Sequence, residues 1–190
     1  MLLMLPWVAM AQEKKDEKYL AGAVPVENGK VIFTKTIEAP LSAEAMYGIV
    51  KEWIGENYQP VEERPNHKLI AENPESYEVT AGGEEWLVFT NRALSLDRTR
   101  MYYKINIICY QDKCTARLFD IRYWYDEERE GGERYKAEEW ITDEWALNKK
   151  GTKLSRMSGK FRRKTVDRAE ELFEDLEIFI SRKAIKSLMK

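Results

Sequence analysis

Apolar and polar side chains alternate over residues 30–38, and this two-residue period predicts a β-strand with one buried face. After Pro40 the period changes. Apolar residues recur every three or four positions over residues 43–58, which predicts an amphipathic helix with Ser42 as its N-cap. The expected buried positions are Val31, Phe33 and Ile37 in the strand, and Met46, Ile49, Val50, Trp53 and Ile54 in the helix.

Four further strands are predicted after this helix, over residues 67–72, 84–91, 100–110 and 114–125. The segment 72–83, which contains Pro74 and the Gly82-Gly83 pair, is expected to be a loop, with a brief pairing at residues 77–79 as a possible exception. The last two strands are apolar on both faces, so we expect them to be covered at least partly on both sides. One face carries Tyr103, Ile105, Ile107, Cys109, Cys114, Ala116 and Leu118, and the other Ile108, Phe119, Ile121 and Tyr123.

The strongest helical pattern lies at the end of the chain. An apolar stripe runs from about residue 165 to 188, and Thr165 is placed to cap the helix. The segment 126–160 before it is predicted to be an excursion that packs across the domain through Trp140, Ile141 and Trp145, since exposing them together would leave a large apolar patch.

The order of elements is strand, helix, four strands, excursion and long helix. This order predicts an α+β fold in which one antiparallel curved sheet carries both helices on one face. We expect a single domain over residues 30–188, preceded by a polar leading arm over 12–29.

Residues 1–11 are apolar throughout and end in Ala9-Met10-Ala11, which is typical of a cleaved signal peptide, although a basic n-region is missing. The stretch is shorter than the roughly 20 residues that span a membrane, so no stable transmembrane anchor is expected. The interpretation is therefore export to the periplasm or beyond, with cleavage before Gln12.

Cys109 and Cys114 lie five positions apart, across a predicted two-residue turn at Gln111-Asp112. That turn places them opposite each other in a non-hydrogen-bonded pair, where side chains approach most closely. Export favours a disulfide between them, and the alternative is two unlinked apolar residues in the core. A metal site is not expected, because His67 is the one histidine and too few ligands are at hand.

Charge is strongly segregated around the excursion. Residues 126–144 carry nine acidic and three basic side chains, net −6, whereas residues 149–168 carry nine basic and one acidic, net +8. The two blocks are expected to face one another, or the basic run to dock on an anionic lipid or glycan. Nucleic-acid binding is disfavoured by the export signal and by the overall net charge of −2.

No catalytic motif or cofactor motif is found. The glycine pairs lack the spacing of a phosphate-binding loop, and His67 is expected at the surface without a catalytic partner. The acidic residues that would have to approach each other in a carboxylate-dependent hydrolase of glycan or peptidoglycan are Asp120, Glu138, Glu139 and Asp143.

The aromatic residues Trp124, Trp140 and Trp145 are the candidate binding residues. They are interpreted either as ordinary packing or as part of a groove for a ligand where the excursion crosses the sheet. The function favoured by the sequence is a non-enzymatic exported binding or interaction domain, with a protein, glycan or lipid as its unidentified partner. The hydrolase remains the alternative.

From about residue 24 to 185 the chain resembles a family of exported bacterial domains of unknown function, common in gut anaerobes, with a TATA-box-binding-protein-like fold. The resemblance lies in "VPVENGKVIFTKTIEAPLS", "RMYYKINIICYQDKC" and "AEEWITDEWALNKKGTKLSRMSGKFRRKTVD". It implies a strand, helix, four-strand, helix unit and no particular activity. The two cysteines beside the hairpin turn depart from the family pattern.

Overall fold

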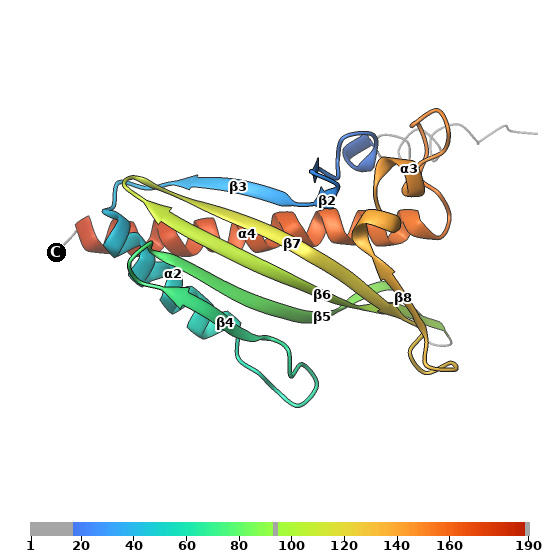
Figure 1. Cartoon of the computed structure of the whole chain (residues 1–190), viewed down its shortest axis with the longest axis horizontal. Helices are drawn as coiled ribbons and strands as arrows, with labels where there is room; N and C mark the ends of the chain where they lie inside the picture. Colours follow the sequence, from blue (N-terminus) through green and yellow to red (C-terminus); the bar gives the residue numbers. More distant parts are fainter. Residues whose placement is uncertain (1–16, 93–94, 189–190) are drawn as a thin grey trace, which may run out of the picture.

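The computed structural model describes residues 17–92 and 95–188, and its centre is one antiparallel sheet (Figure 1). Every strand pairing in this sheet is antiparallel. Along the sheet the strands follow the order β3 (Phe33–Glu38), β7 (Lys113–Tyr125), β6 (Ser95–Tyr110), β5 (Glu78–Arg92) and β4 (Lys68–Asn73), and β8 (Glu133–Lys136) pairs with the end of β7.

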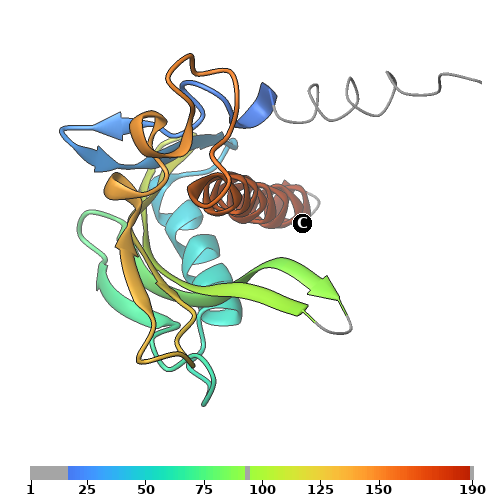
Figure 2. The same cartoon turned by 90° about the vertical axis from the view of Figure 1, so that its right-hand side faces the viewer.

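Two helices, α2 (Ala43–Asn57) and α4 (Ser158–Leu188), lie on one side of the sheet (Figure 2). The hydroxyl of Ser42 accepts a hydrogen bond from the backbone N–H of Ala45, so the predicted cap of α2 is confirmed. The predicted α+β fold with both helices on one face is confirmed as well. The core between the helices and the sheet includes Ile37, Met46, Val50, Trp53, Ile105, Ile107, Leu118, Phe161, Leu176 and Ile180.

Helix α4 begins at Ser158, seven residues before the predicted start. Thr165, the predicted cap, lies inside the helix and is buried, with its hydroxyl 2.6 Å from the hydroxyl of Tyr123. The hydroxyl of Ser155 accepts from the backbone N–H of Gly159 instead. Residues 158–164 are mostly basic, so their sequence does not show the apolar period of a helix. They nevertheless form helical turns whose buried side includes Phe161 and Thr165.

Strand β5 begins at Glu78 and is continuous through Gly82 and Gly83, so the loop expected over 72–83, with a brief pairing at 77–79, is wrong for its second half. The ring of Tyr103 passes so close beneath Gly83 that a Cβ there would lie 2.0 Å from its Cζ. Glycine is therefore required at this point of the strand by a neighbouring side chain, and it does not mark a turn.

A β-bulge in β7 reverses the expected alternation of its side chains. The register with β6 shifts between Tyr102 and Lys104, and Asp120 in the bulge has φ of 53°. As a result Ile121 and Tyr123 point toward the helices and are buried. The prediction that both faces of this strand pair are covered is thereby corrected, since two of the four residues assigned to the outer face belong to the core.

The leading arm and the excursion meet beside α4. The arm contains η1 (Glu17–Tyr19) and β1 (Val26–Glu27), which pairs with β2 (Lys30–Val31) just after it, and the excursion contains β8, η2 (Ala137–Glu139) and α3 (Asp143–Ala146). Arg162 of α4 is fully buried and donates to the carbonyls of Tyr19, Leu20 and Ile141 and to the carboxylate of Asp143. One guanidinium thus holds three chain segments together.

Cys109 and Cys114 face each other in the β6–β7 register, as predicted, but both are free and buried thiols. The backbone N–H of Cys109 donates to Tyr77 on the side away from β7, which is the geometry of a non-hydrogen-bonded pair. The predicted disulfide is corrected to two core thiols. Burial raises the pKa of each to about 12, so the thiolate that disulfide exchange requires is scarce.

The predicted signal peptide, residues 1–11, lies outside the described residues. Among the helices of the described ranges, none is long and apolar enough to cross a membrane.

Candidate functional site

The open face of the sheet, opposite the helices, is hollowed into a cavity of about 720 Å³, called the groove below. This volume lies within the range of about 300–1,000 Å³ typical of ligand pockets. Five strands contribute to it. The lining residues are Asn66, Lys68, Ile70, Gly82, Gly83, Tyr102, Tyr103, Lys104, Arg122, Tyr123, Trp124, Arg134, Tyr135, Lys136 and Glu139.

Strand register brings the polar groups of the groove together. Residues directly opposite each other in antiparallel strands project from the same face. One cross-strand row joins Lys68 to Gly82 and Gly82 to Lys104. The next joins Tyr102 to Arg122 and Arg122 to Lys136, and a third joins Trp124 to Arg134; these three rows place five basic side chains on one surface.

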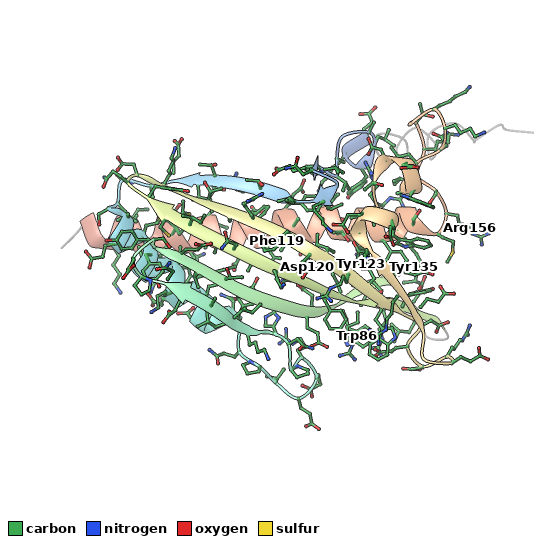
Figure 3. All side chains as sticks on the ribbon, viewed as in Figure 1. Trp86, Phe119, Asp120, Tyr123, Tyr135 and Arg156 are labelled. Carbon is green, nitrogen blue, oxygen red and sulfur yellow. The ribbon has the colours of Figure 1, made fainter. Side chains whose placement is uncertain are left out.

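Asp120 fixes two of these cations. Its carboxylate lies 2.9 Å from Nζ of Lys104 and 3.4 Å from Nε of Arg122. Figure 3 shows Asp120 in the middle of the sheet, between Phe119 and Tyr123 along β7. The bulge that turns Ile121 into the core therefore also places a carboxylate where it holds neighbouring cations in position.

Two aromatic residues of the groove, Trp124 and Tyr135, each have a partner on one ring face. The guanidinium of Arg134 lies 4.2 Å from the ring centroid of Trp124, whose Nε1 donates to the carbonyl of Gly131. Tyr135 stacks on Trp140 with centroids 3.9 Å apart and planes within 8°. These contacts hold the rings of Trp124 and Tyr135 in place in the wall of the groove and occupy one face of each.

The three predicted tryptophans are not brought together in one site. Trp124 lines the groove, whereas Trp140 is half-buried between Tyr135 and Phe161 and supports the wall from behind. Trp145 is 52% exposed on α3 and is absent from the groove lining. In this segment Ile141 is fully buried, so packing through Trp140 and Ile141 is observed but packing through Trp145 is not.

A polar network lies next to the groove and reaches it at Asn66. Glu84 accepts from Arg100 and from the backbone and side chain of Asn66, and Arg100 also donates to Glu127. Burial by itself would raise the pKa of Glu84, but these hydrogen bonds outweigh it and lower the pKa. Burial raises the pKa of Tyr102 nearby, so its hydroxyl stays protonated.

His67 is buried, so the expectation of a surface histidine is wrong. Its Nδ1 accepts from the backbone N–H of Glu84, which leaves Nε2 to donate to the carbonyl of Asn57, and its ring stacks on Tyr58. Burial lowers its pKa and favours the neutral form. Both ring nitrogens are used to hold the chain between α2 and β4, which is a structural role.

The four candidate carboxylates do not share the groove. Glu139 lines it and Asp120 lies beside it, but Glu138 and Asp143 line a separate cavity of about 540 Å³ next to the leading arm. Glu138 accepts from the backbone of Val31, and Asp143 accepts from Gly22 and Arg162. Within the described ranges no cluster of three or more His, Cys, Asp or Glu side chains is suited to hold a metal ion.

Sequence reasoning missed the groove itself. Its cations belong to five different strands and are scattered from residue 68 to residue 136. The available signal was their parity, because Tyr102, Lys104, Arg122, Trp124, Arg134 and Lys136 all occupy even positions. The shared even positions indicate a common face only when the bulge in β7 and the register of the strands are already known.

Comparison with known proteins places the fold in a known group. The family model described as "Domain of unknown function (DUF4468) with TBP-like fold" matches residues 33–124. A TBP-like protein from Parabacteroides distasonis has a TM-score of 0.66 at 21% identity, covering 84% of this chain and 97% of its own, and shows the fold alone. No curated protein matches.

A closer likeness in sequence is found in the crystal structure of a DUF4468 family protein from Bacteroides ovatus. It is 39% identical, with a TM-score of 0.77 over 87% of this chain and 94% of that one. A relative so similar over nearly its whole length shows the family as well as the fold. This chain belongs to the DUF4468 family of domains of unknown function with a TBP-like fold.

Proposed function

We propose that this protein is an exported, non-enzymatic binding domain whose ligand occupies the groove on the open face of the sheet. The observation that carries the proposal is the groove itself. It is a cavity of about 720 Å³ with polar and charged groups converging from five strands. Export is supported by the signal-like residues 1–11.

The polar groups beside the groove support binding more than hydrolysis. A hydrolase of the expected kind needs two carboxylates on opposite sides of one bond, one of them free to act on a proton. Glu139 is the one carboxylate among the groove residues, while Glu138 and Asp143 already accept structural hydrogen bonds elsewhere.

The test uses the full chain with soluble oligosaccharides and peptidoglycan fragments. We expect a groove ligand to raise the melting temperature progressively as its concentration is raised above its Kd, with no new product seen by chromatography. The variants Asp120→Asn and Glu139→Gln should show the same absence of product. A product that disappears in one of these variants would replace the binding proposal by the hydrolase.

Export is tested separately. Protein recovered from the envelope of the native host is expected to begin at Gln12 by intact-mass analysis. A species that retains Met1 would remove export from the proposal without affecting the groove.

A further inference from the structure

We infer that the groove binds an acidic oligosaccharide, which it recognises through the carboxylate or sulfate groups of that ligand. This inference rests on the proposed binding function and names its ligand class. Among the residues that line the groove, five are cationic and one is anionic. With Asp120 beside them, five cations face two carboxylates, so the groove is net positive although the chain as a whole has a net charge of −2.

Two of the cations have no carboxylate partner. Within the described part of the chain, neither Lys68 nor Arg134 forms an ion pair, and Arg134 lies instead over the face of Trp124. Arg122 is held through its Nε by Asp120, which leaves its two terminal nitrogens for a ligand. A guanidinium presented in this way forms bidentate hydrogen bonds with a carboxylate or sulfate.

The cations are too widely spread to serve a single anion. Lys68 on β4 and Lys136 on β8 are separated by four strand spacings, roughly 19 Å at about 4.8 Å each. An extended ligand with several negative groups matches this spread. Tyr102, between them, supplies a phenolic hydroxyl suited to a ligand rich in hydroxyl groups.

Covered ring faces disfavour nucleic acid and neutral sugars. Single-stranded nucleic acid is held by stacking of bases on exposed aromatic rings. In the groove, Arg134 covers one face of Trp124 and Trp140 covers one face of Tyr135. With these faces taken, the groove offers a ligand more through its cations and hydroxyl group than through stacking on its rings.

The position of the groove disfavours an acidic peptide or a membrane. Extended peptides bind a sheet by adding a strand to its free edge, whereas the groove lies on the face across five strands. Proteins bind a flat anionic membrane through cations that protrude from the surface with apolar side chains around them. The cations here surround a hollow whose one exposed large aliphatic residue is Ile70.

The test is calorimetric titration of the full chain with four probes: tetragalacturonate, a heparin tetrasaccharide, neutral maltotetraose and single-stranded oligo-dT. We expect one acidic saccharide to bind, with carboxylate or sulfate selectivity read from the first two probes. Affinity should fall as salt is raised from about 50 mM to about 300 mM, because the interaction is between charges near the surface.

Two double variants separate the groove from general charge. Arg122→Gln with Arg134→Gln removes two groove cations, and Lys149→Gln with Lys150→Gln removes two exposed cations in the loop before α4. The first pair should weaken binding about tenfold or more, through the loss of charge-assisted hydrogen bonds. The second should change it less than about twofold. Near-UV circular dichroism checks that both variants are folded.

Each remaining outcome overturns the inference. If maltotetraose binds and the acidic probes bind no better, the groove is a binding site but charge does not select its ligand. Preference for oligo-dT would assign the groove to nucleic acid. If no acidic probe binds, or if the groove variant binds as tightly as the control variant, acidic saccharides are not its ligands.

Discussion

At the scale of single residues, Gly83 and His67 show how neighbours decide a role that residue type leaves open. A glycine pair inside a polar stretch is typical of a turn, yet Gly83 lies in mid-strand because the ring of Tyr103 fills the space of its missing side chain. A histidine after proline and asparagine is typical of the surface, yet His67 is buried with both nitrogens bonded.

Gly83→Ala is expected to lower the free energy of unfolding by about 3 kcal/mol, since the new methyl group must displace a buried ring. Gly48→Ala is the matched control. Its Cβ would meet no atom within 4 Å in the middle of α2, so it should raise stability by about 0.5–1 kcal/mol. Urea denaturation measures both values. Equal effects at the two positions would contradict the close packing of Tyr103 under β5.

His67 predicts a loss of stability in mild acid. Its pKa is lowered in the folded protein, so the unfolded chain takes up the proton at higher pH. The free energy of unfolding should therefore be highest above about pH 7 and fall as the pH drops below about 6.5. His67→Gln should remove most of the difference between pH 7.5 and pH 5.5 in urea denaturation. If the stability difference between pH 7.5 and pH 5.5 is the same in His67→Gln, other titrating groups cause the loss of stability in acid.

At the scale of elements, Arg162 explains how two polar segments are attached to the domain although they bury few apolar side chains. The leading arm and the excursion are both rich in charge, but the arm buries Tyr19 and the excursion buries Ile141 beside this guanidinium. Its hydrogen bonds to Tyr19, Leu20, Ile141 and Asp143 are 2.6 to 2.8 Å long.

Arg162→Met is expected to destabilise the protein by about 3–5 kcal/mol, because the carboxylate and carbonyls around it lose their donor. Hydrogen exchange should increase first over residues 17–24, including the Gly22 amide that donates to Asp143. Lys164→Met, on an exposed position of the same helix, should change stability by less than about 0.5 kcal/mol. Unchanged exchange over 17–24 would show that the arm is held by other contacts.

At the scale of the whole molecule, the opposed charge blocks do not simply neutralise one another. Arg162 and Asp143 join them, but Lys160 pairs with Asp97 and Arg168 with Glu85, both on the sheet. From the acidic block, Glu127 and Glu128 pair with Arg100 and Arg98. The two blocks therefore form mostly separate ion pairs. The acidic block pairs the excursion with the long β5–β6 hairpin, and the basic block pairs α4 with the same hairpin.

The two core thiols should report global unfolding. Cys109 and Cys114 are buried where the β6–β7 hairpin meets the helical layer, and burial raises their pKa to about 12. Ellman's reagent should therefore detect almost no thiol in the native protein and two thiols per chain in urea. The rise should follow the loss of circular dichroism, since no smaller opening is expected to expose them. Fewer than two thiols in urea without reductant would indicate the disulfide after all.

The sequence by itself determined the layers of this protein. The alternation over residues 30–38 and the apolar stripe of the last helix show which side of each element is buried. Such periods involve only residues close together in the chain, so they can be recognised from the sequence. The order of strands and helices then restricts the sheet to one that carries both helices on one face, and the turn at Gln111-Asp112 sets the pairing of Cys109 with Cys114.

Only the tertiary structure decided the site. The bulge at Asp120, the glycine above Tyr103 and the rows of cations depend on which residues of distant strands lie opposite each other. Shifting the register by one residue would send the same side chains into the core. Because that register is set by the packing of the whole sheet, the shared even positions within single strands do not by themselves reveal the groove.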